Sequence, residues 1–287
     1  MRHAAVGVDI GGTKLLMLAE GQDLEAPLIR RLATGPSVVP ADIEAAVGAF
    51  IADNALKPTA LGVAVPGLVE NGQVKISDVL PQLTGWEGLH HDGTPPLLVN
   101  DIRGALAQEA AALSKASSAV VIVCGTAVGS AYLCEGRVVR GSRGWAGEIG
   151  SMPMPTPQGV KRLDDLAGGG AIVRAVGEHP EQIHAALATG DPRTRSIVNG
   201  AGEALGLAIA SLVNILNPDV VRIAGGTLGY AGYWDTAVAT ARTHTLLELW
   251  DVCTVGRIQA AELVVARGAM RLAAASTDGQ AWVQQYV

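Results

Sequence analysis

The chain has 287 residues, of which 49% are hydrophobic and 17% are charged. This length and apolar content predict one large or two medium-sized globular domains with well-filled cores. The net charge of −6 provides no basic face for a nucleic-acid backbone, so nucleic acid is excluded as an expected partner.

The cysteines and the hydrophobic runs indicate the compartment. Cys124, Cys134 and Cys253 are an odd number, and the first two lie in apolar, strand-like runs, which predicts buried free thiols in a reducing environment. Asp9 follows the first residue too closely for the core of a signal peptide. The most hydrophobic stretch, residues 117–136, is broken by glycines and falls short of the ~18 uninterrupted apolar residues of a membrane span. We expect a cytoplasmic protein with no membrane partner.

The first part of the chain predicts an α/β domain. Short apolar runs bounded by glycine or proline favour strands, and apolar residues at helical spacing favour helices. In chain order the sequence predicts strands at 4–10, 14–21 and 26–34, a helix at 41–56, strands at 61–69 and 95–102, and a helix at 102–115.

The second part repeats this order of elements. It predicts strands at 117–126, 129–136 and 137–144, a helix at 162–176 that the glycines 168–170 interrupt, a core-facing helix at 201–217, a strand at 219–229, and C-terminal helices at 261–276 and 278–287. The repeated order indicates an internal duplication, with two α/β domains facing each other and the last helices crossing back to the first domain.

Three glycine turns each follow an apolar strand: DIGGTK at 9–14, CGTAVGS at 124–130 and AGGTLG at 224–229. Successive backbone N–H groups in such turns can bind phosphate oxygens without steric obstruction. Taken singly, each turn is equally explained as a tight hairpin. The spacing of a P-loop and the Rossmann fingerprint are both absent, so the three turns together predict a different kind of nucleotide site.

The motifs DIGGTK, VPGLV, VNDI, CGTAVG, WAGEIG and IAGGTLG, in this order, resemble those of the ROK family of sugar kinases. The resemblance implies two ribonuclease-H-like domains of the actin-like ATPase superfamily around a central cleft. It places the N-terminal domain at 1–102, completed by a helix at about 275–287, and the C-terminal domain at 103–274. ROK repressors carry an additional N-terminal DNA-binding domain, for which a first motif at residue 9 leaves no room.

The resemblance further implies ATP and Mg²⁺ as cofactors, a small-molecule sugar as substrate, and a homodimer. Asp9 would hold Mg²⁺ through water, although it is alternatively a turn-forming residue. Lys14 is either a phosphate contact or a solvated strand residue. The residues implied in nucleotide binding are Asp9, Gly11, Gly12, Thr13, Lys14, Gly125, Thr126, Gly225 and Gly226.

The sugar end is implied by the second set of motifs. Asp101 resembles the catalytic base that accepts the proton of the attacking hydroxyl, and it is also interpretable as the N-cap of the following helix. Glu148 is suited to a vicinal diol, since each carboxylate oxygen accepts one O–H, but an ordinary surface charge is the alternative. The residues implied in sugar binding are Gly67, Gln82, Asn100, Asp101, Glu148, Ser151 and Asp164. Trp86 also falls where the family often has a tryptophan near the sugar.

The chain departs from the family after WAGEIG. Most ROK kinases continue there with a histidine and the pattern C-x-C-G-x-x-G-C-x-E, which binds a structural zinc. Here Ser151 stands at the histidine position and the loop contains no cysteine, so we predict no zinc site. Asp164 stands at the terminal glutamate, with Asp165 as the alternative register. These shorter side chains make an amino sugar or an N-acetylhexosamine an alternative to glucose.

The sequence therefore predicts an ATP-dependent kinase that phosphorylates the 6-hydroxyl of a hexose or amino-hexose, with Asp101 as general base. Two alternatives belong to other classes. One is a non-catalytic sugar sensor on the same scaffold, and the other is an ATP-hydrolysing assembly protein of the actin-like superfamily.

Overall fold

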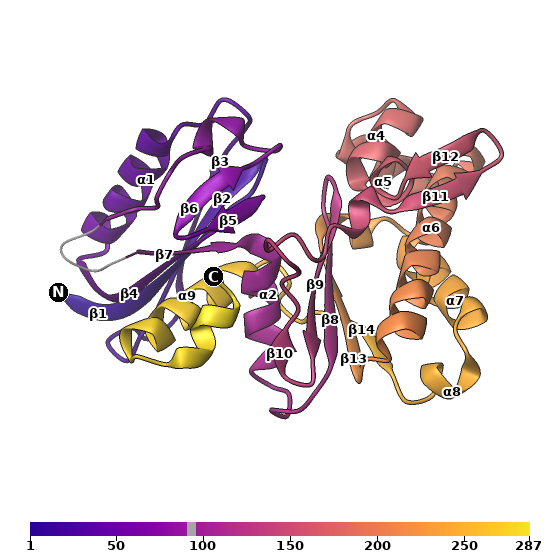
Figure 1. The fold of residues 1–287 in the computed structure, drawn as a ribbon. Coiled ribbons are helices and arrows are strands. Elements are labelled where there is room, and N and C mark those ends of the chain that lie inside the picture. Colours follow the sequence, from indigo (N-terminus) through magenta and orange to yellow (C-terminus); the bar gives the residue numbers. More distant parts are fainter. Residues whose placement is uncertain (91–95) are drawn as a thin grey trace. The chain divides into compact units, whose positions relative to one another are not determined.

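The computed structural model describes residues 1–90 and 96–287, which form two compact units (Figure 1). Unit 1 comprises Met1–Leu113, Arg140–Trp145 and Glu262–Val287, and unit 2 comprises Ser114–Val139 and Ala146–Ala261. Unit 1 extends beyond the expected limit at residue 102 because helix α2 (Asp101–Ala110) packs along helix α9 (Val264–Thr277). Helix α9, which begins before residue 275, is therefore the helix that completes this unit.

Unit 1 is built on a five-stranded sheet in the order β3-β2-β1-β4-β7. β1, β2 and β3 form an antiparallel meander, and β1, β4 and β7 run parallel. The strand expected at 95–102 is observed from residue 96, and residue 95 lies outside the described residues. The strands are β1 (Arg2–Ile10), β2 (Lys14–Glu20), β3 (Leu28–Ala33), β4 (Leu56–Val65) and β7 (Pro96–Asn100).

The two faces of this sheet bury different kinds of side chain. Val6, Val8 and Ile10 of β1 belong to the larger core cluster, which includes buried residues of helix α1 (Pro40–Asp53). The alternate positions pack against α9, where Leu16 and Leu18 of β2 contact a second cluster. Because successive strand residues point to opposite faces, one sheet serves two apolar layers.

The remaining elements of unit 1 are short. They are the hairpin of β5 (Leu68–Glu70) and β6 (Gln73–Ile76) and the 3-10 helices η1 (Pro81–Leu83) and η4 (Ala281–Gln285). η4 replaces the longer helix expected at 278–287. Gly279 has a φ of 71° directly after α9, so the chain turns there and only one short helical segment follows.

Unit 2 repeats the sheet of unit 1 in the order β10-β9-β8-β13-β14, with the same antiparallel and parallel pairings. The expected internal duplication is therefore confirmed. β10 is much shorter than the strand expected at 137–144, because residues 140–145 leave the sheet and belong to unit 1. The strands are β8 (Ala119–Cys124), β9 (Val128–Cys134), β10 (Arg137–Val138), β13 (Val220–Ala224) and β14 (Thr254–Arg257).

The remaining elements of unit 2 follow the sequence in part. The predicted interruption is present, since Gly168 separates α3 (Asp164–Ala167) from α4 (Gly169–Val176). Unforeseen from the sequence are the helices α5, α7 and α8, the hairpin of β11 and β12, and the edge strand β14. The further elements are η2 (Ile149–Ser151), β11 (Pro153–Thr156), β12 (Gly159–Arg162), α5 (Pro180–Thr189), α6 (Pro192–Leu216), η3 (Gly226–Gly229), α7 (Tyr233–His244) and α8 (Leu247–Trp250).

Helix α6 is the central helix of unit 2. It begins nine residues before the expected start at residue 201, because the carboxylate of Asp191 caps it by accepting a 2.7 Å hydrogen bond from Thr194 N, and proline follows at the first helical position. Among the described residues it is the one helix whose length and composition would suit a membrane span. Leu205, Ile209 and Val213 are fully buried against the sheet and α7, however, so α6 is a core helix.

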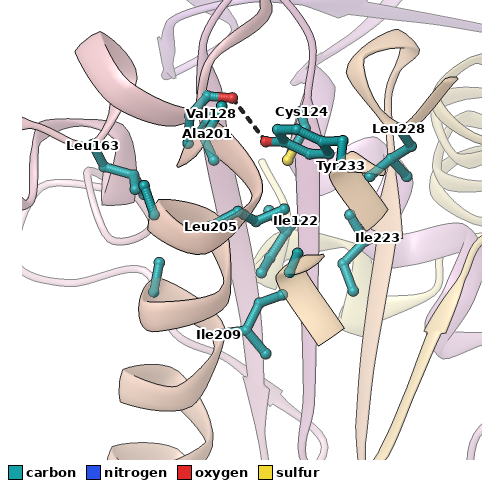
Figure 2. Packing of buried hydrophobic residues seen from close by; sticks show 14 of the residues in the cluster. Ile122, Cys124, Val128, Leu163, Ala201, Leu205, Ile209, Ile223, Leu228 and Tyr233 are labelled. Carbon is teal, nitrogen blue, oxygen red and sulfur yellow. Dashed lines mark hydrogen bonds between the residues drawn. The ribbon is translucent and has the colours of Figure 1, made fainter. Parts of the chain in front are cut away.

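Figure 2 shows the core that α6 covers, with Ile122 and Cys124 of β8 facing Leu205 and Ile209. Tyr233 at the start of α7 is fully buried there, and its hydroxyl donates a 2.7 Å hydrogen bond to the carbonyl oxygen of Ala167. Burial also raises the pKa of the Cys124 thiol to about 12, so it is an inert core residue.

The expectation of buried thiols is correct for one of the two strand cysteines. Cys124 is buried in the core of unit 2, as is Cys253, which follows α8. Cys134 is exposed, because it is the last residue of β9 and lies at the turn into β10. The expectation that Cys134 is buried was therefore wrong.

A glycine in β4 sets the distance between the sheet of unit 1 and α9. A Cβ at Gly62 would lie 2.0 Å from the carbonyl oxygen of Ala269, so the helix backbone rests directly on the strand. Gly62→Ala must push α9 away, and we expect it to lower the free energy of unfolding by about 2–3 kcal/mol, as for an overpacked core. Urea denaturation measures this change.

Gly48→Ala is the matched control in the same unit. Gly48 lies within α1, and a Cβ there would have no neighbour within 4 Å. Removing a glycine from a helix interior should raise the free energy of unfolding by about 0.5–1 kcal/mol. Equal effects of the two substitutions would contradict the close contact between β4 and α9.

Candidate functional site

Asp9 stands near the carboxyl end of β1, at the head of the first glycine turn. Its side chain is half-buried, and no hydrogen bond within the described ranges engages its carboxylate. Burial raises the pKa of Asp9 to about 6, and the positive charge of Lys14 lowers it in part. The fold thus maintains a carboxyl group whose ionised form it disfavours, which is typical of functional sites.

The backbone amides of the turn after Asp9 differ in whether they donate a hydrogen bond to the backbone. The N–H of Gly11 donates to the carbonyl oxygen of Lys14 at 2.8 Å, and Thr34 Oγ1 donates to the carbonyl oxygen of Gly11. Gly11 therefore closes a hairpin turn, as the alternative interpretation proposed. The amides of Gly12 and Thr13 have no backbone acceptor in the described part of the chain, so these two are the ones available to an anion.

In unit 2 the other two glycine turns pack together. Gly225 has a φ of 116°, and a Cβ there would lie 2.0 Å from the carbonyl oxygen of Cys124. Thr227 Oγ1 donates a 2.9 Å hydrogen bond to the carbonyl oxygen of Gly125. Only glycine permits this backbone conformation and approach, so the turns at 124–127 and 224–227 form one continuous surface.

A third glycine segment joins them. The amides of Gly169 and Gly170 donate to the carbonyl oxygens of Gly125 and Thr126 at 2.8 and 3.0 Å. The sequence showed these glycines only as a helix interruption, although a triplet of glycines was itself a signal of close backbone contact. These hydrogen bonds engage the carbonyl groups of Gly125 and Thr126. The amide of Thr126 has no backbone acceptor among the described residues, so this N–H group is available to an anion.

Asn100 organises the start of α2, where the sequence predicts sugar-binding residues of unit 1. Its Oδ1 accepts hydrogen bonds from Ile102 N at 3.0 Å and Arg103 N at 3.1 Å, and its Nδ2 donates to the carbonyl oxygen of Gly67 at 2.9 Å. Asn100 is therefore the N-cap of α2, and the interpretation of Asp101 as the cap was wrong. Gly67 and Asn100 are brought together, but chiefly to fix the backbone.

Asp101 is the first residue of α2 and is half-buried. Its Oδ1 accepts hydrogen bonds from Asn100 Nδ2 at 3.0 Å and Ile102 N at 2.9 Å. These two donors fix the orientation of the Asp101 carboxylate at the start of α2.

Gln82 and Trp86, the other two residues expected near the sugar, lie in different surroundings. Gln82 is exposed on η1, and no hydrogen bond within the described ranges joins it to Asn100 or Asp101. Trp86 is 7% exposed, and its Nε1 donates a 3.0 Å hydrogen bond to Glu44. Trp86 is therefore a core residue that ties this loop to α1.

The loop of unit 2 that carries Glu148 is fixed on both sides. Before it, the carbonyl oxygen of Gly147 accepts hydrogen bonds from Ser130 N and Ser130 Oγ, both at 2.9 Å. After it, Ile149 is buried in the core. Glu148 itself is exposed, and burial together with the nearby charge of Glu148 raises the pKa of Tyr132. A carboxylate is thus presented on a rigid support.

Ser151 and Asp164 each have an intramolecular partner. Ser151 Oγ accepts a 2.6 Å hydrogen bond from Arg162 Nη2, a residue that sequence reasoning missed. Asp164 Oδ1 accepts a 2.7 Å hydrogen bond from Val128 N, and it leaves no space for a side chain at Gly150. Asp164 therefore braces the turn at 124–128 against the Glu148 loop, which is a structural use of the predicted sugar contact.

The loop that follows Glu148 and the carboxylate of Asp9 differ in the metal ion that they could bind. Counting back from Asp164, the zinc-ligand positions of the family pattern hold Ser151, Pro155, Pro157 and Arg162, none of which is a zinc ligand. Zinc therefore does not fit this loop. Magnesium keeps several waters and takes phosphate oxygens, so a single buried carboxylate such as Asp9 fits its needs. Across residues 1–90 and 96–287, no three His, Cys, Asp or Glu side chains form a group that could hold a metal alone.

Comparison with known proteins identifies the family. Residues 5–276 match the ROK family, which is nearly the whole chain. The chain belongs to the ROK family. The expected fold of two ribonuclease-H-like α/β domains is confirmed by a ROK family glucokinase from Streptomyces griseus, solved with glucose and AMPPNP, with a TM-score of 0.77 and 21% identity over 94% of this chain and 99% of that chain.

Two relatives with similar sequences cover most of this ROK chain. It is 26% identical to the bifunctional enzyme NanE/NanK of Brucella suis biovar 1, covering 85% of this chain but 49% of that protein. It is also 26% identical to an N-acetylmannosamine kinase of Salmonella typhi, covering 79% of this chain and 84% of that protein. The chain thus spans about half the length of the bifunctional relative.

The raised pKa of Asp9 predicts how its removal changes stability. Below the ordinary pKa of 3.8 both the folded and unfolded states are protonated and the carboxyl costs nothing. Between that value and about 6 the unfolded state ionises first, so stability falls as pH rises, and above pH 6 the full cost remains. Asp9→Asn should therefore raise the free energy of unfolding at pH 7.5 by about 1–2 kcal/mol, discounted for partial exposure.

Urea denaturation at pH 7.5 and pH 4 tests this expectation. Most of the gain should be absent at pH 4, where the wild-type carboxyl is largely protonated in the folded state. A gain of the same size at both pH values would show that the substitution acts through packing and not through ionisation.

Proposed function

We propose that this ROK protein is an ATP-dependent sugar kinase that phosphorylates the 6-hydroxyl of a hexose or N-acylated or free amino-hexose. The observation that carries the proposal is the state of Asp101. Because Asn100 caps α2, Asp101 is held at the positive end of the helix without being needed to begin it. A fixed, ionised carboxylate of this kind is what proton removal from an alcohol requires.

The proposed reaction assigns a role to each group. One Asp101 oxygen accepts the proton of the sugar hydroxyl as the hydroxyl oxygen bonds to the γ-phosphorus of ATP. The bond from that phosphorus to the β–γ bridging oxygen breaks, and ADP leaves. Positioning and charge neutralisation supply most of the catalysis in such transfers. Magnesium held beside Asp9 would supply positive charge to the phosphate oxygens.

The proposed phosphate contacts come from backbone amides. Gly12 and Thr13 in unit 1 and Thr126 in unit 2 have amides without a backbone acceptor in the described segments. Gly11, Gly125, Gly225 and Gly226 shape these turns, and Lys14 adds a positive charge. Oriented N–H groups bind phosphate without desolvating a charged side chain, so the design suits a polyanion such as ATP.

The proposed sugar contacts are Glu148, which suits a vicinal diol, and Ser151 in unit 2, and Gln82, Asn100 and Asp101 in unit 1. The name of one relative, an N-acetylmannosamine kinase, supports an N-acetylhexosamine among the candidate substrates. A reducing cytoplasm supplies ATP and fits the free cysteines, and a homodimer remains our expectation from the family.

A panel of sugars tests the proposal directly. ADP release coupled to a reporter enzyme should depend on one of glucose, mannose, N-acetylmannosamine, N-acetylglucosamine or 3-amino-glucose. Calorimetric sugar binding without ADP release would instead support the sensor, and ADP release without any sugar would support the ATP-hydrolysing assembly protein.

Asp101→Asn tests the mechanism. An asparagine Oδ1 can keep both hydrogen bonds that Asp101 Oδ1 accepts, so the fold and sugar binding should be preserved. Loss of the base should lower kcat by at least ~10²-fold, the low end for general base catalysis. The control is Asp53→Asn, which removes an exposed carboxylate paired with Arg30 and should leave kcat unchanged. Undiminished turnover in Asp101→Asn would exclude Asp101 as the base.

A further inference from the structure

The loop that presents Glu148 is fastened to the β11–β12 hairpin at one side chain. Arg162, the last residue of β12, donates from Nη2 to Ser151 Oγ at 2.6 Å. Next to this bond, Leu163 N donates to the carbonyl oxygen of Met152 at 3.0 Å. Within the described residues this is the one side-chain hydrogen bond of Arg162, and no carboxylate pairs with it.

The two residues that form this hydrogen bond stand at zinc-ligand positions of the family pattern. In the family pattern quoted above, a histidine at position 151 and a cysteine at position 162 share one zinc ion. Here the same two positions hold a serine and an arginine in direct hydrogen-bonding contact. The other two ligand positions, Pro155 and Pro157, lie on and directly after β11, whose ladder with β12 runs from Pro153↔Arg162 to Thr156↔Gly159.

We propose that the Arg162–Ser151 hydrogen bond, together with the β11–β12 ladder, replaces zinc in holding the Glu148 loop, so that Arg162 is a positioning residue for the sugar. This inference rests on the proposed function for its kinetic part and on the structure alone for its loop-ordering part. A guanidinium suits this task because its charge strengthens the bond to a neutral hydroxyl and its planar fork fixes the direction.

The rest of the loop explains why one hydrogen bond is sufficient. Gly147 is already tied to Ser130, and Ile149 is buried, so the segment before Ser151 has its own anchors. Ser151 ends η2 and is exposed, and its bond to Arg162 lies beside the backbone bond from Leu163 N to the carbonyl oxygen of Met152. The two bonds together anchor the segment that follows Glu148 to the hairpin.

Four variants test the proposal. Arg162→Ala and Ser151→Ala each remove the bond, Arg162→Lys keeps a cationic donor, and Lys161→Ala is the matched control. Lys161 is the neighbouring exposed cation on the same strand, and it lines a groove of about 470 Å³ between the hairpin and helices α4 and α6. Successive strand residues point to opposite faces, so Lys161 does not share the bond.

The first readout is hydrogen exchange of the amides at 147–152, which needs no activity. Arg162→Ala and Ser151→Ala should raise exchange there to a similar extent, and the double variant should add little. Lys161→Ala should match the wild type, and Arg162→Lys should restore part of the protection. Exchange in Arg162→Ala that equals that of Lys161→Ala would overturn the proposal.

The second readout is kinetic. Loss of one exposed charge-assisted hydrogen bond should raise the KM for the sugar about 3- to 10-fold and leave the KM for ATP unchanged. An unchanged KM for the sugar, with increased exchange, would reject the positioning role. If no sugar is phosphorylated by the wild type, the proposed function fails while the exchange experiment still decides the inference.

The third readout is metal content. Protein purified without chelator should contain far less than one zinc per chain by mass spectrometry of the elements. Treatment with a zinc chelator should leave the exchange at 147–152 and the thermal unfolding midpoint unchanged. One zinc per chain, or chelator-induced exchange in this loop, would show that a metal still performs the task.

Discussion

Contact of main chain with main chain is the constraint on which the architecture of both units depends. Gly62 lets the backbone of α9 rest on β4, and Gly225 lets the turn at 224–227 rest on Cys124. Such contacts leave no room for a Cβ, so the distances are set by hard atoms and not by side chains that can rearrange. The same device therefore fixes the layers of unit 1 and the glycine turns of unit 2 that we propose for phosphate binding.

The acidic residues of the candidate site show how position decides what a carboxyl group does. Burial disfavours the ionised form of Asp9, two hydrogen-bond donors hold Asp101 at the start of α2, and Asp164 accepts a hydrogen bond from the amide of Val128. A cation-binding group gains from the first environment, since a bound cation relieves the cost of burial. A proton acceptor gains from the second, and a structural brace from the third.

The fold was predictable where short-range patterns decide it. Apolar runs located every strand of the two five-stranded sheets except β14, and the glycine at 168 correctly divided α3 from α4. The failures have physical reasons. β10 is short because residues 140–145 leave unit 2, and the cap of α2 is Asn100 because its side chain reaches two amides and Gly67 at once. Neither tertiary choice is encoded in local spacing.

Within the site, the resemblance supplied the residue types but not their partners. It selected Asp164 by its place in a pattern, while the structure shows that its Oδ1 holds the amide of Val128. It could not select Arg162, because the family pattern has a cysteine at that position and an arginine reads as a surface charge. Only the 2.6 Å contact with Ser151 distinguishes the two cases.

The change from the zinc-binding pattern of the family therefore affects all of its ligand positions together and is not the loss of a single ligand. A structural zinc site normally uses four protein ligands in a tetrahedral arrangement. All four ligand positions have changed here, and the two that face each other now form a hydrogen bond. Pro155 on β11 and Pro157 directly after it restrict the backbone of the hairpin and lower the entropy lost when it forms. Under our proposal, the prolines and the hydrogen bond thus give the Glu148 loop the rigidity that zinc would supply in the family pattern.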